Sequence, residues 1–373
     1  MDLTRHEQQR YARHISLPEV GMAGQLRLKN ARVLIVGAGG LGSPVALYLA
    51  AAGVGHIGII DDDVVDLTNL QRQIIHTDAA IGQPKVASAQ AGMQGINPCI
   101  DITTYGYRLT AANVLGLVTL YDVVVDATDS FATRYIVNDA CVILQKPMVY
   151  GAIFRFEGQV SVFAPHLGGP CYRCLFPDPP PAELAPNCAE AGVFGVLPGV
   201  VGSVQATEAL KAILGIGLSL CGRLWLYDAL TMQVDTWQIA PNPACPRCGT
   251  NPILNGIIAV DALCTPLLNA DEWSPIQLQE RLAQSPAPFV LDVREPHEFA
   301  LSHLAGAVRI GVNEVATRVD ELRTVGSIIV YCRSGMRSAR ARELLRQHGL
   351  TAVSLAGGLL AWRRDIAPQM PVA

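Results

Sequence analysis

Short apolar runs alternate with longer amphipathic stretches through the first 250 residues of the chain. A short apolar run bounded by turn residues is typical of a buried strand, and strands alternating with helices indicate a mostly parallel sheet. We expect strands at the start of 31–42, which runs into a glycine turn, and at His56–Ile60, Asp122–Asp126, Pro147–Gly151, 158–165 and 223–229. Glu7–Ile15 is amphipathic, and we expect helices at Pro44–Ala52, Lys85–Ile96 and Val200–Leu214. This pattern predicts an α/β domain, Rossmann-like and with a mixed sheet.

The same alternation returns on a smaller scale from about Trp273 to the end of the chain. Strands are expected within 288–295, 327–331 and 351–358, with a helix that ends near His348. The sequence therefore predicts a first domain over residues 1–250, a linker over 251–272 and a smaller α/β domain over 273–373. A proline-rich segment, 176–188, excludes a helix or a central strand and is expected to form a surface loop.

Composition excludes several classes of protein. Half of the 373 residues are hydrophobic, and the formal net charge is −4, which argues against a nucleic-acid partner. The sequence shows no apolar run of the roughly 18 residues needed to cross a bilayer, and residues 1–10 are polar and charged, so we expect no membrane partner. Ten cysteines are too sparse for a disulfide scaffold. We expect a cytoplasmic protein with reduced thiols.

A glycine motif follows the first buried strand. Gly37, Gly39 and Gly42 form GxGxxG before a helix, a pattern that lets backbone N–H groups approach phosphate. Asp61 ends the next strand, where it is placed to accept from ribose hydroxyls. By itself this pattern is typical of a nicotinamide-dependent dehydrogenase.

The residues that follow favour a triphosphate over a nicotinamide. Asn69, Arg72 and Gln73 come shortly after Asp61, and Lys85 comes next, so two cations lie where a triphosphate needs them. The P-loop pattern GxxxxGK[ST] is absent from the sequence. We therefore expect ATP, bound by a Rossmann-like loop.

Two carboxylates end a later strand in VVVDATDS. Asp126 and Asp129 are expected at the carboxyl edge of the sheet, where open α/β sheets bind ligands. A carboxylate there can hold Mg²⁺ against the phosphates. The alternative for Asp129 is the N-cap of a helix.

Eight motifs occur in the order found in the MoeB/ThiF family, which the chain resembles over about residues 5–250. They are RYARH, GAGGLGSP, DDDVVDLTNLQRQIIH, GQPKV, DATDSFATRY, CYRC, CAEAGVFG and CPRC. Enzymes of this family adenylate the C-terminal glycine of a small ubiquitin-like sulfur-carrier protein. The resemblance implies that Gly40 and Asp61 contact ATP. It implies that Arg72 and Lys85 bind the phosphates and that Asn69 helps to position them. It also implies that Asp129 holds magnesium and that Arg13 reaches the active site of the neighbouring subunit in a homodimer. A carboxylate that attacks the α-phosphate brings two anions together, so cations are required.

Four cysteines form two CxxC pairs about seventy residues apart. Cys171 and Cys174 form the first pair, and Cys245 and Cys248 form the second. Two such pairs complete a tetrahedral S4 site, which indicates structural Zn²⁺. The competing interpretation is a redox CxxC, of which two in one chain would be unusual.

Two further cysteines are candidates for sulfur chemistry. Cys188 follows the proline-rich segment, and in the family this position can bear a reactive thiol; the alternative is an exposed, inert thiol. Cys332 opens the loop CRSGMRS between a strand and a helix, where backbone N–H groups, the helix N-terminus, Arg333 and Arg337 favour an anionic sulfur. The remaining thiols are expected to be inert packing residues: Cys99, Cys141, Cys221 and Cys264.

The second block resembles the rhodanese family over about residues 273–370. The matching pieces are LDVREPHEF, SHLAGAVRI, VYCRSGMRS and AGGLLAWRR. Cys332 matches the cysteine that carries sulfur, whereas Asp292 and Arg294 match a pair with a structural role. The loop from Cys332 to Arg337 has the six-residue length of a sulfurtransferase; phosphatases of this architecture need a longer loop.

Together the two resemblances imply an adenylyltransferase fused to a sulfurtransferase. The carrier's Gly-Gly carboxylate is adenylated first, and a Cys332 persulfide, charged by a cysteine desulfurase or by thiosulfate, then supplies sulfur for a C-terminal thiocarboxylate. Cys188 would hold the carrier as a thioester or release the product reductively. Three alternatives are a nicotinamide-dependent oxidoreductase with a fused rhodanese, an activator that conjugates the carrier to proteins, and a non-catalytic scaffold. The pathway of the carrier, whether molybdopterin, thiamine, tRNA thiolation or a specialised metabolite, is left open.

Overall fold

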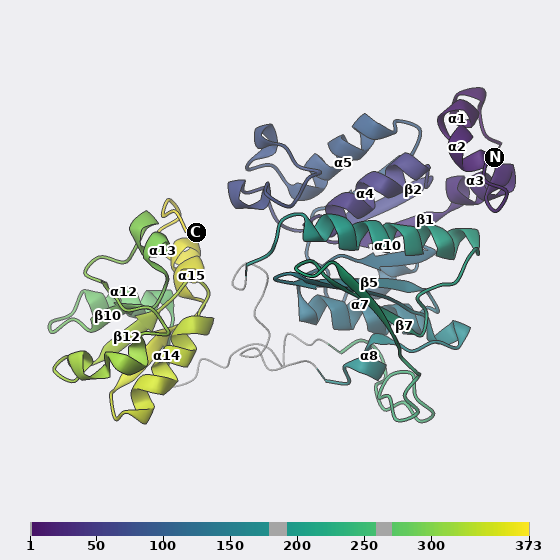
Figure 1. Ribbon diagram of the computed structural model, residues 1–373. Coiled ribbons are helices and arrows are strands. Elements are labelled where there is room, and N and C mark those ends of the chain that lie inside the picture. The colour runs from purple at the N-terminus through teal and green to yellow at the C-terminus, as the bar shows by residue number, and fades with distance from the viewer. Residues whose placement is uncertain (1, 179–191, 259–270, 373) are drawn as a thin grey trace. The chain divides into compact units, whose positions relative to one another are not determined.

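The computed structural model describes residues 2–178, 192–258 and 271–372 (Figure 1). Within these ranges the chain divides into two compact units, one on each side of residues 259–270. The expected limits of the two domains, at residues 250 and 273, stay predictions. Most of the expected linker and most of the proline-rich segment lie outside the described residues. In the part of the chain that the structure describes, no helix is long and apolar enough to span a bilayer.

The first unit is built on an eight-stranded mixed sheet. The strands, in their order across the sheet, are β3 (Asp101–Tyr105), β2 (His56–Ile60), β1 (Arg32–Val36), β4 (Val123–Asp126), β5 (Met148–Phe154), β6 (Glu157–Phe163), β7 (Arg223–Asp228) and β8 (Gln233–Gln238). The strands from β3 to β5 pair in parallel, and those from β5 to β8 pair antiparallel. The expected mixed sheet is confirmed.

Helices cover both faces of this sheet (Figure 1). The helices are α1 (Arg5–Arg10), α2 (Ala12–Ile15), α3 (Gly21–Asn30), α4 (Gly42–Ala52), α5 (Lys85–Ile96), α6 (Val114–Val118), α7 (Phe131–Ile143), α8 (Tyr172–Leu175) and α10 (Leu197–Leu214). Alternate residues of β1 face two separate cores: Val33 and Ile35 pack with α4, α5 and α10, whereas Leu34 and Val36 pack with α6 and α7. Burial on both faces explains the continuous apolar runs in the sequence.

The amphipathic stretch Glu7–Ile15 lies within two short helices, α1 and α2, which meet at Tyr11. Two strands were not predicted from the sequence. Strand β3 escaped prediction because its DITTY sequence has no apolar run. Strand β8 escaped prediction because every residue of it is exposed, so it is held by backbone pairing with β7 and has no buried face.

The second unit contains a five-stranded parallel sheet. Its strands, in order across the sheet, are β11 (Val308–Arg309), β10 (Phe289–Asp292), β12 (Ile328–Tyr331), β13 (Ala352–Leu355) and β9 (Glu272–Trp273). Its helices are α12 (Pro275–Leu282), α13 (Pro296–Leu301), α14 (Met336–Gln347) and α15 (Gly358–Asp365). The expected smaller α/β fold is confirmed.

Candidate functional site

A cavity of about 280 Å³ opens at the carboxyl ends of β1, β2 and β4. The strand order reverses direction at β1, which is the place where open α/β sheets bind ligands. Gly37, Asp61 and Asp129 all line this cavity, so the structure brings together three residues that lie far apart in the sequence.

The glycine loop leaves no room for side chains at two positions. Gly37 has a φ of 101°, and a Cβ there would lie 2.8 Å from the carbonyl oxygen of Ala127. A Cβ at Gly42 would lie 2.0 Å from the carbonyl oxygen of Gly37. Among the described residues, the N–H groups of Gly39 and Gly40 have no hydrogen-bond partner. These amides precede the N-terminus of α4 and suit an anion.

Asp61 is already engaged with the protein backbone. One carboxylate oxygen accepts from the N–H of Ala38 at 2.8 Å, and the other accepts from the N–H of Asp63 at 2.9 Å. Burial raises the pKa of Asp61. The side chain therefore shapes the glycine loop in addition to lining the cavity.

The residues expected to serve the phosphates have different surroundings. A Cβ at Gly40 would lie 3.6 Å from Cγ of Arg72, which places the arginine against the loop. Lys85, buried in the first turn of α5, pairs with Asp63 at 2.7 Å. The side chain of Asn69 accepts from the N–H of Asp66 at 3.2 Å and closes a local turn; its expected part in positioning phosphate stays a prediction. Arg13 is exposed on α2 and does not line the cavity.

The two aspartates after β4 have different surroundings. Asp126 is fully buried and accepts from Nε of Arg134 at 2.8 Å, so its carboxylate is engaged in the interior. Asp129 lines the cavity, and among the described residues its carboxylate makes no hydrogen bond or ion pair. The N-cap of α7 is Ser130, whose hydroxyl accepts from Thr133, so the N-cap alternative for Asp129 is wrong. An unpaired carboxylate at this edge fits Mg²⁺.

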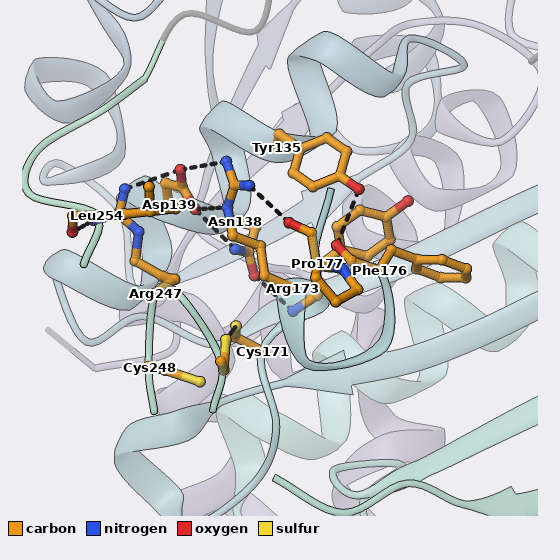
Figure 2. A network of polar contacts seen from close by, with 12 residues as sticks. Tyr135, Asn138, Asp139, Cys171, Arg173, Phe176, Pro177, Arg247, Cys248 and Leu254 are labelled. Carbon is orange, nitrogen blue, oxygen red and sulfur yellow. Dashed lines mark hydrogen bonds and ion pairs between the residues drawn. The ribbon is translucent and has the colours of Figure 1, made fainter. Parts of the chain in front are cut away.

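The four CxxC cysteines converge. Figure 2 labels one cysteine of each pair, Cys171 and Cys248. All four sulfurs lie within 4.8 Å of one another, and the separations are 3.5 Å for Cys171–Cys245, 3.4 Å for Cys174–Cys248 and 4.0 Å for Cys171–Cys174. A tetrahedral zinc with Zn–S bonds of about 2.3 Å places its sulfurs about 3.8 Å apart, so this donor set fits the ion. Hydrogen bonding with Cys171 and Cys248 lowers the pKa of the Cys174 thiol.

Cys332 lies in a backbone cradle of the second unit. It directly follows β12, is fully buried, and accepts from the N–H of Gly335 at 3.2 Å; the Ser338 hydroxyl lies 3.5 Å from the sulfur. Arg337 was expected to add positive potential here. Its guanidinium also donates to both oxygens of Glu298, at 2.6 and 2.7 Å, so this carboxylate offsets part of the positive charge beside the loop.

The remaining predicted residues have clear positions. Arg294 and Asp292 are fully buried and form a bidentate ion pair, in keeping with the expected structural role. Cys141 is buried, but Cys99 is exposed and lies 3.6 Å from Nδ1 of His6, because it stands in the loop between α5 and β3; the packing role expected for it is wrong. Cys188 and Cys264 lie outside the described residues.

Comparison with known protein families identifies both units. Residues 11–247 match the ThiF family, and residues 274–365 match the rhodanese-like domain. The chain belongs to the ThiF family. The resemblance inferred from the motifs is thus confirmed, as is the fusion with a C-terminal rhodanese domain.

Two relatives match this ThiF-family chain over nearly its whole length, and a third matches about 71% of it. It is 44% identical to the probable adenylyltransferase/sulfurtransferase MoeZ of Mycobacterium tuberculosis, over 99% of this chain and 96% of the relative. It is 42% identical to the adenylyltransferase and sulfurtransferase MOCS3-1 of Zea mays, over 97% of this chain and 83% of that protein. The sulfur carrier protein adenylyltransferase of Thermus thermophilus is 52% identical over 71% of this chain and 99% of its own length. A crystal structure of E. coli MccB with MccA-N7isoASN shares the fold, with a TM-score of 0.58 and 22% identity over 66% of this chain and 76% of that chain.

Two residues that shape the site in the ThiF domain were not predicted from the sequence. His76 is buried, with Nε2 2.9 Å from the carbonyl oxygen of Ala38 and Nδ1 2.9 Å from the Ser88 hydroxyl. Arg134 donates to the carbonyl oxygen of Thr128 at 2.8 Å as well as to Asp126, and so fixes the loop that carries Asp129. Both residues lie inside the quoted motifs, but only the three-dimensional contacts reveal their partners.

Proposed function

We propose that this chain adenylates the C-terminal glycine of a ubiquitin-like sulfur-carrier protein and converts it to a thiocarboxylate with sulfur from Cys332. The observation that carries the proposal is one chain holding both a ThiF nucleotide pocket, with an unpaired Asp129, and a rhodanese loop in which the N–H of Gly335 faces the sulfur of Cys332. Relatives named adenylyltransferase and sulfurtransferase support it. These names favour adenylation over nicotinamide chemistry.

The ThiF domain performs the first reaction. The amides of Gly39 and Gly40, with Arg72 and Lys85, bind the phosphates of ATP. Asp129 holds Mg²⁺, which neutralises phosphate charge when bound. A carboxylate oxygen of the carrier attacks the α-phosphorus, the bond to the bridging oxygen breaks, and pyrophosphate leaves. In the structure the ammonium group of Lys85 pairs with Asp63. To bind the phosphates, this group must contact them in addition to Asp63 or in its place.

The rhodanese domain supplies sulfur in the second reaction. A cysteine desulfurase or thiosulfate transfers sulfane sulfur to Cys332. The terminal sulfur of the persulfide attacks the acyl carbon, AMP leaves, and an acyl disulfide joins the carrier to Cys332. A second thiol attacks Sγ of Cys332, which releases the thiocarboxylate and leaves a disulfide that an external dithiol reduces. Cys188 is the chain's candidate for that thiol. The tether between the domains raises the effective concentration of persulfide near the adenylate.

Three further features belong to the proposal. The chain forms a homodimer in which Arg13 completes the active site of the partner subunit, consistent with its exposure on α2. Cys171, Cys174, Cys245 and Cys248 hold one structural Zn²⁺. The protein acts in the cytoplasm, where thiols stay reduced.

The proposal is tested with a purified ubiquitin-like carrier that ends in Gly-Gly, together with ATP, magnesium, thiosulfate and a dithiol reductant. We expect carrier-dependent exchange of labelled pyrophosphate into ATP and a gain of about 16 Da at the carrier's C-terminus, where sulfur replaces oxygen. Exchange without the mass gain would refute the sulfur-transfer step. Tight NADH binding with no exchange would refute adenylation and support the oxidoreductase alternative.

A further inference from the structure

Both CxxC turns carry an arginine as their third residue, and the two guanidinium groups meet at one carboxylate (Figure 2). Asp139 on α7 accepts from Nε and Nη2 of Arg173 at 2.8 and 2.9 Å. It also accepts from Nη2 of Arg247 at 3.0 Å. Asp139 is therefore the common partner of two turns that lie 74 residues apart in the sequence.

The same arginines hold the backbone that follows each turn. Arg173 donates from Nη1 to the carbonyl oxygen of Pro177 at 3.2 Å. Arg247 donates from Nη1 to the carbonyl oxygen of Leu254 at 3.0 Å, and from Nη2 to that of Gly256. Each guanidinium thus joins α7 to a segment on the far side of its turn. Arg173 binds both oxygens of Asp139, which fixes direction as well as distance, whereas Arg247 reaches Asp139 through Nη2 alone. Asp139 therefore orients the first turn and anchors the second turn to the same carboxylate.

The charges of this cluster complement those of the cysteines. Arg173, Arg247 and Asp139 are all buried, and together they leave one excess positive charge in the interior. An isolated buried charge is costly unless an opposite charge lies nearby. Four thiolates around a divalent ion carry a net charge of −2. The arginines and the thiolates therefore stabilise one another.

We propose that Asp139 is the positioning residue of the cysteine cluster: through Arg173 and Arg247 it holds the two CxxC turns face to face and slows loss of the metal. The inference rests on the zinc site proposed above. It assigns no chemistry to Asp139 itself, because its oxygens contact arginines and no sulfur. Groups that orient metal ligands from outside typically change metal affinity about 10- to 100-fold when removed.

The test measures zinc release from the purified, zinc-loaded full chain into excess 4-(2-pyridylazo)resorcinol. Asp139→Asn keeps the shape of the side chain and removes its charge, and we expect release at least about tenfold faster than from the wild type. The matched control is Glu208→Gln. Glu208 is a buried carboxylate of the same unit, on α10, that pairs with Lys211 and caps the N–H of Leu220 without touching the cluster. We expect the control to release zinc at the wild-type rate even where it lowers thermal stability.

A milder variant keeps the test decisive if Asp139→Asn does not fold. Arg247→Lys retains the charge but cannot bind Asp139, Leu254 and Gly256 together, and we expect faster release than from the wild type. Cobalt substitution gives a second measurement, because the sulfur-to-cobalt absorption should be lost at lower chelator concentration in both variants. Zinc release from Asp139→Asn and Arg247→Lys at the rate of Glu208→Gln would overturn the role of Asp139 alone. A wild type that binds no zinc would overturn the zinc site and this inference together.

Discussion

His76 fixes the carbonyl of Ala38, with Nε2 2.9 Å from the oxygen. Because a carbonyl only accepts hydrogen bonds, Nε2 carries the proton. The carbonyl of Ala38 and the N–H of Gly39 belong to one trans peptide, so they point in opposite directions. Holding the carbonyl in the interior therefore turns the Gly39 amide the other way, and this amide has no partner in the described part of the chain. Asp61 holds the N–H of Ala38 at the same time.

Loss of this contact should weaken ATP binding. In His76→Leu the buried carbonyl of Ala38 loses its donor, which costs about 1–3 kcal/mol, and we expect the KM for ATP in pyrophosphate exchange to rise about tenfold. His76→Gln keeps an N–H within reach and should restore most of the affinity. Ser88→Ala removes only the partner of Nδ1 and serves as the control. An unchanged KM in His76→Leu would show that the loop keeps its shape without the ring.

The same histidine predicts a pH dependence of stability. Burial lowers the pKa of His76 below its ordinary value of 6.5. Between the lowered pKa and 6.5 the unfolded chain binds a proton that the folded chain does not, so the free energy of unfolding rises with pH in this window. The stability that the neutral His76 ring contributes is complete above about pH 6.5 and is lost as the pH falls through the lowered pKa. Urea unfolding of the wild type from about pH 5 to about pH 7.5 should show a steeper rise than His76→Gln; equal slopes would contradict this prediction.

Substitutions at Asp129 and Asp126 should affect different properties, activity in the first case and stability in the second. Asp129→Ala removes an unpaired carboxylate from the cavity, and we expect pyrophosphate exchange to fall at least about a hundredfold with an unchanged melting temperature. Asp126→Asn leaves the buried Arg134 without its counter-charge, and we expect a loss of about 3–5 kcal/mol in the free energy of unfolding. Near wild-type exchange in Asp129→Ala would remove this residue from the proposed magnesium site.

The sequence predicted those elements and residues whose signal is local. Buried strands such as β2 were located because both faces are apolar, whereas β8 was missed because it has no buried face. The four cysteines were grouped correctly because CxxC spacing is itself a geometric constraint. The predicted contribution of Arg337 was offset in part by Glu298, a partner 39 residues away whose contact depends on how α13 packs beside α14. Asp139 was missed for the same reason, since its two arginines are neighbours only in the fold.

One zinc ion per chain is expected from metal analysis of freshly purified protein. Cys248→Ser removes one sulfur ligand, and because ligand binding and folding are coupled, we expect a lower melting temperature and less than one zinc per chain. Cys99→Ser is the matched control, since Cys99 is exposed and is not one of the four clustered cysteines. Protein that is fully stable without metal would show that the cluster is not a zinc site.

Adenylation and sulfur transfer should be separable by single substitutions. Cys332→Ala removes the sulfur that the N–H of Gly335 faces, but it leaves every residue of the nucleotide cavity in place, because that cavity lies in the other unit. We therefore expect carrier-dependent pyrophosphate exchange at the wild-type rate and no thiocarboxylate, measured by the intact mass of the carrier. Asp129→Ala should behave in the opposite way: it should lose exchange yet still transfer sulfur from thiosulfate to cyanide through Cys332. Cys188→Ala should slow release of the product without preventing persulfide formation at Cys332. If Cys332→Ala still makes thiocarboxylate at the wild-type rate, the rhodanese domain is not the source of sulfur.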